Sequence, residues 1–123
     1  MNRKVENFKK ALQRLKEASE KAKTDIEIDG AIQRFEFTFE LAWKAIKYIL
    51  EQEGLHCYSP KNCLKEAFSA HLIKNEKTWI DMLGDRNLSV HIYDEKISRE
   101  IFKRIQTLYI TEFESILERM LRY

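Results

Sequence analysis

One apolar stripe constrains the fold of this chain more than any other sequence feature. Large apolar side chains recur every three or four residues over 28–50, which is the spacing of one face of an α-helix. They are Ile28, Ile32, Phe35, Phe39, Trp43, Ile46 and Leu50. Residues 35–39 alternate as a strand would, but the stripe continues on both sides of them, so the helical period prevails. We therefore expect one long helix over about 26–53.

This helix carries further side chains outside the main stripe. Three of them are apolar, namely Phe37, Leu41 and Tyr48. A helix with two apolar faces belongs in the centre of a bundle or at a face that pairs with another subunit. Glu36, Glu40 and Lys44 share a face, and we expect an ordinary intrahelical charge row, worth a few tenths of a kcal/mol, rather than metal ligands.

The remaining sequence predicts more helices of the same kind. With only three Gly and one Pro in 123 residues, the chain lacks the turn residues of a sheet-rich fold. Amphipathic segments are expected at about 2–22, after Ser59-Pro60, after a loop at 71–75, and at about 95–121. The last stripe comprises Ile97, Ile101, Ile105, Leu108, Phe113, Ile116, Leu117 and Met120. The prediction is a single all-α domain over 1–123, a four- to five-helix up-down bundle.

Several residues mark where these helices begin and end. Thr24 or Asp25, Ser59 and Asp94 are suited to cap helix N-termini, and Gly54 is suited to follow a helix C-terminus. Gly84 falls inside the fourth helix, where it costs about 1 kcal/mol relative to alanine, so we expect close packing or a bend there.

The charge distribution excludes some functions. A net charge of +2 is not that of a polycation which coats nucleic acid, but residues 1–23 hold eight basic against three acidic side chains. That helix could face RNA or an acidic protein, or simply be a solvated basic face. The chain shows neither a membrane-span pattern nor a signal-peptide pattern, so we expect a soluble cytoplasmic protein with no membrane association.

The two cysteines fit the same compartment. Cys57 and Cys63 are expected to be reduced, as thiols of cytosolic proteins usually are. His56 and His71 lie nearby, but the spacing matches no familiar zinc pattern, and we expect no metal and no cofactor.

The segment whose side chains are best suited to catalysis is 86–93, which reads RNLSVHIY. It combines a permanent cation (Arg86), an amide (Asn87), an imidazole suited to proton transfer near neutral pH (His91) and a phenol (Tyr93). This set suits phosphodiester chemistry. The alternative is that Arg86 is solvated, His91 ends a helix and Tyr93 fills a core edge.

Helical geometry adds a condition to this motif. Five residues turn a helix by about 500°, which leaves Arg86 and His91 roughly 140° apart on a straight helix. One chain therefore cannot easily aim both at the same phosphate. Two chains related by a two-fold axis could do so, each motif facing its mate, and we expect a homodimer.

The Arg-polar-x-x-x-His pattern resembles the motif of the HEPN superfamily of helical proteins, and Tyr93 two places after His91 resembles the HepT toxin subgroup. Two longer blocks resemble the nucleotidyltransferase substrate-binding protein family. These blocks are RFEFTFELAWK over 34–44 and WIDMLGDRN over 79–87, continuing to HIYDE over 91–95. The resemblance covers nearly the whole chain in order.

The resemblance implies a dimeric HEPN-type subunit that works with a separate minimal nucleotidyltransferase. In one interpretation it is a metal-independent ribonuclease toxin: His91 acts as general acid or base, Arg86 stabilises charge on phosphorus, and Asn87 orients the phosphate or the imidazole. The partner would silence it by transferring AMP to Tyr93.

In the second interpretation the chain is not a catalyst but presents a pocket or surface that holds the substrate of the partner's nucleotidyl transfer. Arg86 and His91 then bind a nucleotide phosphate and transfer no proton. A third interpretation is a helical assembly subunit with a degenerate site. The chain has neither a Gly-rich phosphate loop nor acidic residues arranged for two metals, so we do not expect it to be a nucleotidyltransferase by itself.

Overall fold

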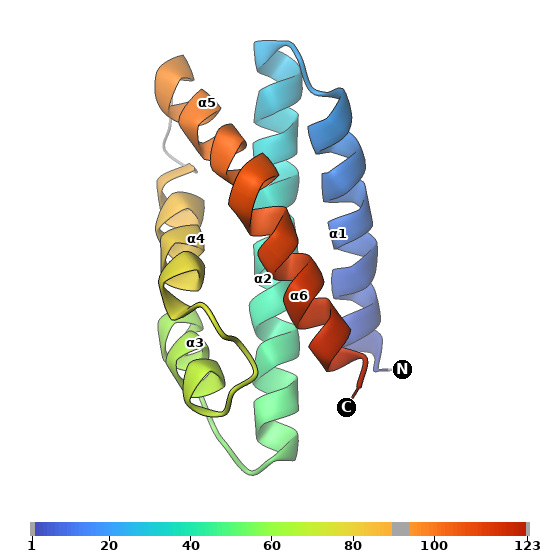
Figure 1. Cartoon of the computed structure of the whole chain (residues 1–123), viewed down its shortest axis with the longest axis vertical. Coiled ribbons are helices and arrows are strands. Elements are labelled where there is room, and N and C mark those ends of the chain that lie inside the picture. Colours follow the sequence, from blue (N-terminus) through green and yellow to red (C-terminus); the bar gives the residue numbers. More distant parts are fainter. Residues whose placement is uncertain (1, 90–93, 123) are drawn as a thin grey trace.

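The computed structural model describes residues 2–89 and 94–122, and these residues form helices joined by short connections (Figure 1). The elements are α1 (Arg3–Lys21), α2 (Asp25–Gln52), α3 (Pro60–Ser69), α4 (Glu76–Ser89), α5 (Glu95–Arg104), the π-helical turn η1 (Ile105–Tyr109) and α6 (Ile110–Met120). Because α5, η1 and α6 run on without a break, the described chain has five helices. The predicted all-α bundle of four to five helices is confirmed.

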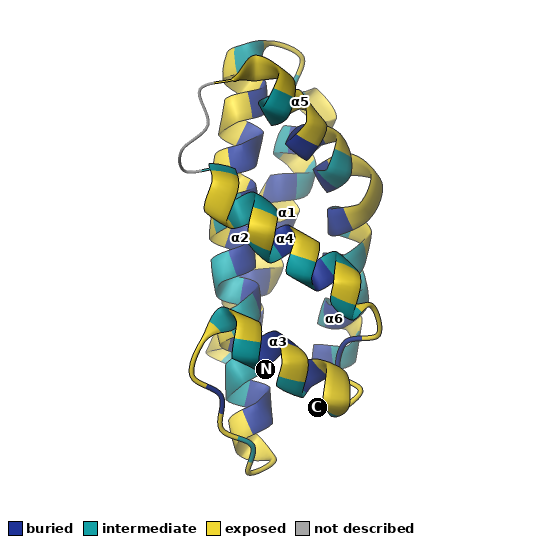
Figure 2. Ribbon diagram, turned by 90° about the vertical axis from the view of Figure 1, so that its left-hand side faces the viewer, coloured by how far each residue is buried: buried dark blue, intermediate teal, exposed yellow. Residues whose placement is uncertain are grey.

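The long helix α2 is the centre of this bundle. It lies beside α1, while the α5–α6 helix crosses it obliquely and α3 and α4 cover its other side (Figure 1). Its apolar stripe is buried, and aromatic rings from three other helices meet there. Phe35 stacks on Tyr109 with ring centroids 5.4 Å apart, and Phe39 lies 6.3 Å from Trp79. Figure 2 shows this division into buried and exposed helix faces.

The predicted helix boundaries are confirmed at four positions. Thr24 caps α2, where its side chain accepts from the backbone N–H of Glu27 and the Glu27 carboxylate accepts from the backbone of Thr24. The side chains of Ser59 and Asp94 accept from backbone N–H groups in the first turns of α3 and α5 and so cap these helices. Gly54 follows α2 with φ +80°, a conformation that glycine adopts without steric cost.

The predicted stripe of the last helix is wrong at Leu108. Its side chain is about half exposed, and Tyr109 is fully buried in its place. The reason is the π-helical turn η1, in which the N–H of Ile110 bonds to the carbonyl of Ile105, five residues back. This wider turn rotates the residues that follow relative to an uninterrupted α-helix.

The expectation of close packing at Gly84 is also wrong. Gly84 is exposed, and a Cβ built on it meets no atom within 4 Å. The α4 helix passes through this position without a break. Packing therefore does not require glycine there.

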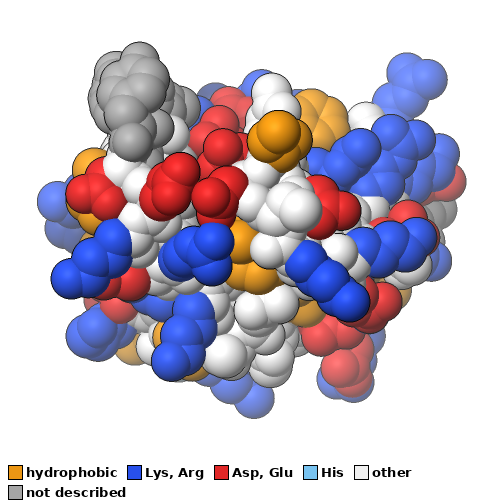
Figure 3. Space-filling model, turned by 90° about the horizontal axis from the view of Figure 1, so that it is seen from above, with side chains coloured by type: hydrophobic (Ala, Val, Ile, Leu, Met, Phe, Trp, Pro, Cys, Tyr) orange, Lys and Arg blue, Asp and Glu red, His pale blue; other side chains and the backbone are white. Residues whose placement is uncertain are grey.

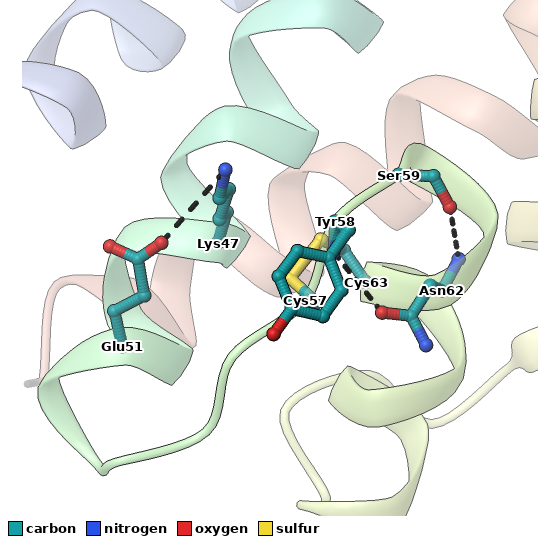
Figure 4. Close-up of a disulfide and its surroundings, with 7 residues drawn as sticks. All are labelled: Lys47, Glu51, Cys57, Tyr58, Ser59, Asn62 and Cys63. Carbon is teal, nitrogen blue, oxygen red and sulfur yellow. Dashed lines mark hydrogen bonds and ion pairs between the residues drawn. A yellow bond between two sulfur atoms is a disulfide. The ribbon is translucent and has the colours of Figure 1, made fainter.

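The two cysteines form a disulfide instead of the free thiols that we expected. Cys57 and Cys63 are bonded and buried, with Cα atoms 5.0 Å apart (Figure 4). The bond joins the α2–α3 connection to the first turn of α3, which begins after the Ser59 cap. With both sulfurs bonded to each other, neither is available as a zinc ligand.

Among the described helices, none is long and apolar enough to cross a membrane.

Candidate functional site

The C-terminal half of α4 brings Arg86 and Asn87 to the surface of α2. Arg86 donates from Nη2 to Oε2 of Glu40 over 2.7 Å and from Nη1 to Oδ1 of Asn87 over 3.1 Å. About one third of the Arg86 side chain remains exposed, as does one third of Glu40. The guanidinium is therefore held in place by α2 but still accessible to an incoming anion.

Glu36 and Glu40 are parts of this site that the sequence prediction missed. The predicted charge row exists, because Lys44 lies 3.5 Å from Glu40. However, both carboxylates also reach α4: Glu40 pairs with Arg86, and Glu36 accepts a 2.6 Å hydrogen bond from the Ser89 hydroxyl. Their four-residue spacing places them on one face of α2, but no signal in the sequence says which helix covers that face.

A groove of about 1150 Å³ runs from this site along α2 to the end of α1. Its lining residues come from the three helices and the α1–α2 connection. They are Ala18, Lys21, Ala22, Glu27, Gly30, Ala31, Gln33, Arg34, Glu36, Phe37, Glu40, Arg86 and Asn87.

The groove combines cations with an exposed aromatic ring. Lys21 and Arg34 are exposed and make no ion pair with any described residue, so their charge is available to a ligand. The Phe37 ring is 60% exposed, and Gly30 contributes no side chain to block the floor. Figure 3 shows the molecule from above, at the end where α1 joins α2, and basic and acidic side chains are intermixed there with small apolar areas.

Asp85 lies next to Arg86 in the sequence, but its partners are on the α5–η1–α6 helix and not on α2. It accepts two hydrogen bonds from Arg104, at 2.7 and 3.0 Å, and one from the Tyr109 hydroxyl at 2.5 Å. Burial, with the hydrogen bond to Asp85 second, raises the pKa of Tyr109 above its usual range. The hydrogen bond to Asp85 likewise raises the pKa of Arg104, so the phenol stays protonated and the guanidinium stays charged.

Comparison with known proteins agrees with this architecture. The family model described as "Nucleotidyltransferase substrate binding protein like" matches residues 3–122. The chain belongs to this family. A curated relative from Haemophilus influenzae, named "Probable ribonuclease HepT", is 32% identical over 101 residues, which cover 78% of this chain and 68% of the relative.

Two solved structures share the fold of this substrate-binding-protein-like chain. One, a crystal structure from Thermus thermophilus, is 39% identical with a TM-score of 0.85, and the match covers 92% of this chain and 98% of that one. The other is HI0074 from Haemophilus influenzae, described as having the fold of a substrate-binding domain of a nucleotidyltransferase. It is 26% identical with a TM-score of 0.82, and the match covers 94% of this chain and 98% of that one.

Of the four site residues predicted for this family member, the structure brings two together. Arg86 and Asn87 share a hydrogen bond at the groove. His91 and Tyr93 lie outside the described residues, two positions after Ser89 and one position before Asp94 in the sequence. Their roles remain predictions.

In residues 2–89 and 94–122, no three His, Cys, Asp or Glu side chains gather as a metal site would require. The carboxylates at the groove instead have specific partners on α4, Arg86 for Glu40 and Ser89 for Glu36.

Proposed function

We propose that this chain is the HEPN-type subunit of a two-component toxin–antitoxin system in the cytoplasm, a metal-independent ribonuclease whose partner is a minimal nucleotidyltransferase. The observation that carries the proposal is the Arg86 guanidinium, held by Glu40 at the edge of a groove that also presents Lys21 and Arg34. The name of the Haemophilus relative, "Probable ribonuclease HepT", supports the same reaction class.

The proposed reaction is an internal transesterification of RNA. His91 takes the proton from a ribose 2′-OH, the 2′-oxygen forms a bond to phosphorus, and the P–O5′ bond breaks. The leaving 5′-oxygen takes a proton from water, and the other product ends in a 2′,3′-cyclic phosphate. Arg86 stabilises the negative charge that develops on the phosphoryl oxygens, and Asn87 orients the phosphate or the imidazole.

Phe37 supports the proposal that the active form is a homodimer. Its ring is 60% exposed on the groove wall, and Leu88, one residue after Asn87, is 46% exposed. Exposed apolar side chains beside a polar site are typical of a surface that another protein covers. A second copy placed there would bring a second motif to the groove. Arg86 of one chain and His91 of the other could then face the same phosphate, which the two residues of one straight helix cannot easily do.

The second part of the proposal is silencing by the partner nucleotidyltransferase. The partner would transfer AMP from ATP to the Tyr93 oxygen, so that a bond to the α-phosphorus forms and pyrophosphate leaves. The phosphate added to Tyr93 would repel an RNA backbone. A cytoplasmic location agrees with an RNA substrate, although disulfides are rare there. Burial of both sulfurs of the Cys57–Cys63 bond limits their access to cellular thiols.

Cleavage of labelled RNA by the partner-free protein in EDTA tests the proposal. Mass spectrometry first establishes that Tyr93 carries no modification. We expect cleavage with 2′,3′-cyclic phosphate ends, its loss in His91→Ala, and a decrease of about 10²–10³-fold in Arg86→Ala. His56→Ala, which removes an exposed imidazole elsewhere, is the matched control and should keep full activity.

The second candidate function is a non-catalytic subunit that holds the substrate of the partner nucleotidyltransferase. The description of HI0074 as a substrate-binding domain favours it, and the cations of the groove would then bind a nucleotide phosphate. Unmodified wild-type protein that leaves RNA intact, together with partner activity that depends on this chain, would replace the first proposal with this one.

A further inference from the structure

The π-helical turn η1 has a geometric consequence for the residues at its two ends. Arg104 and Tyr109 are five residues apart, and on a straight α-helix they would point roughly 140° away from each other. In η1 the N–H of Ile110 bonds to the carbonyl of Ile105, so five residues close one turn. Arg104 and Tyr109 therefore share a face, and both reach Asp85.

The resulting cluster is well ordered by its contacts. The Asp85 side chain is only 13% exposed. Its carboxylate accepts three hydrogen bonds, two from the planar guanidinium of Arg104 and one from the Tyr109 hydroxyl. The Tyr109 ring is itself fixed, because it is fully buried and stacks on Phe35 at an interplanar angle of 18°. A bidentate pair with an additional neutral donor is among the more directional arrangements that side chains make.

This cluster acts on α4 at the residue before Arg86. Asp85 attaches α4 to the α5–α6 helix, and Arg86 attaches it to Glu40 of α2. Neighbouring residues of an α-helix point about 100° apart, so the two ion pairs hold α4 from two directions and limit its rotation about its own axis. Arg104 also neutralises Asp85, and without it this carboxylate would attract the guanidinium of Arg86 away from the groove.

We propose that Asp85, held by Arg104 and Tyr109, is a positioning residue that directs the Arg86 side chain into the groove, and that η1 exists to bring its two donors together. For its catalytic consequence the proposal rests on the proposed ribonuclease function. The position of Arg86 itself can be measured without any activity. π-Helical turns are rare and frequently occur at functional sites, which agrees with this assignment.

The first experiment observes Arg86 directly. In the ¹H–¹⁵N spectrum of the arginine Nε–Hε groups, the Arg86 signal is identified by its loss in Arg86→Lys. Tyr109→Phe removes one hydroxyl and keeps the ring that stacks on Phe35. We expect it to shift and broaden the Arg86 signal. Tyr48→Phe is the matched control, because Tyr48 lines a separate hollow beside Asn2, and it should leave the signal unchanged.

The second experiment measures RNA cleavage by the same variants. We expect kcat of Tyr109→Phe to fall about tenfold with KM within about twofold, because misplacement of Arg86 affects the transition state more than binding. If Tyr109→Phe does not fold, Arg104→Lys serves instead, since it keeps the cation but gives up the planar two-point contact with Asp85.

The two experiments separate the two proposals. An Arg86 signal that is identical in wild type and Tyr109→Phe would overturn the positioning role, even if the variant melts at a lower temperature. A wild-type protein that leaves RNA intact would overturn the ribonuclease proposal, and the Arg86 signal would still decide whether the cluster positions this side chain.

Discussion

Arg86 on α4 and Glu40 on α2 are 46 residues apart in the sequence and are joined by a 2.7 Å ion pair at the edge of the groove. The pair connects Arg86, the described residue best suited to bind a phosphate, to α2, the longest helix of the bundle. About one third of the Arg86 side chain is exposed, so its guanidinium stays within reach of a ligand. The ion pair limits the orientations that the guanidinium can adopt.

The strength of this pair can be measured by a double-mutant cycle. For Arg86→Ala, Glu40→Ala and the double variant, urea unfolding should give a coupling energy of about 0.5–1 kcal/mol, because solvent screens a pair that is one third exposed. The pair Lys47 and Glu51, 4.0 Å apart on one face of α2, provides the comparison and should give a smaller value. A coupling of zero for Arg86 and Glu40 would show that the ion pair does not persist in solution.

The disulfide predicts a stability that depends on reductant. Opening the short loop closed by Cys57 and Cys63 should lower the free energy of unfolding by about 2 kcal/mol, from the chain entropy that the unfolded state regains. Thermal melts with and without a phosphine reductant measure this difference. The double variant Cys57→Ala, Cys63→Ala should melt at one temperature in both conditions.

The redox state of the two cysteines is checked by alkylation of the protein unfolded in denaturant, before any reductant is added, because both sulfurs are buried in the folded protein. Detection of two alkylated cysteines would contradict the disulfide and would support free thiols instead.

Tyr109 predicts a loss of stability at alkaline pH. Its pKa is raised in the folded protein by burial and by the bond to Asp85, whereas the unfolded side chain titrates near 10. The stability that the protonated phenol contributes is therefore fully present below about pH 10. It is lost as the pH rises above about 10 toward the higher pKa of the folded protein. Urea unfolding at pH 8 to 11 should show this decrease in wild type and a smaller decrease in Tyr109→Phe. Equal decreases in the two proteins would mean that Tyr109 ionises as freely when folded as when unfolded.

Gly84→Ala should stabilise the protein by up to about 1 kcal/mol. The residue is helical and exposed, and an added Cβ meets no atom within 4 Å, so the substitution restricts the unfolded chain without a steric cost. The midpoint of urea unfolding measures the effect. Gly54→Ala is the opposite control: Gly54 has φ +80°, and its replacement should destabilise. A destabilised Gly84→Ala would indicate that another molecule packs against this position.

Much of the fold was predictable because it depends on short-range rules. The stripe over 28–50, the caps at Thr24, Ser59 and Asp94 and the glycine after α2 act within a few residues of chain, so the helices and their boundaries follow from local sequence. The motif 86–93 was recognisable for the same reason. Its residues are contiguous, and their chemistry does not depend on the fold.

The remaining features arise between segments that are distant in the sequence. The sequence by itself determined that α2 carries Glu36 and Glu40 on one face and that α4 carries Asp85 and Arg86. Only the tertiary structure decided that Glu40 receives Arg86 and that a π-helical turn brings Arg104 and Tyr109 to Asp85. The physical reason is that helical periodicity specifies which side chains share a face, whereas the packing of whole helices selects the partner of each face and adjusts the local turn to match it.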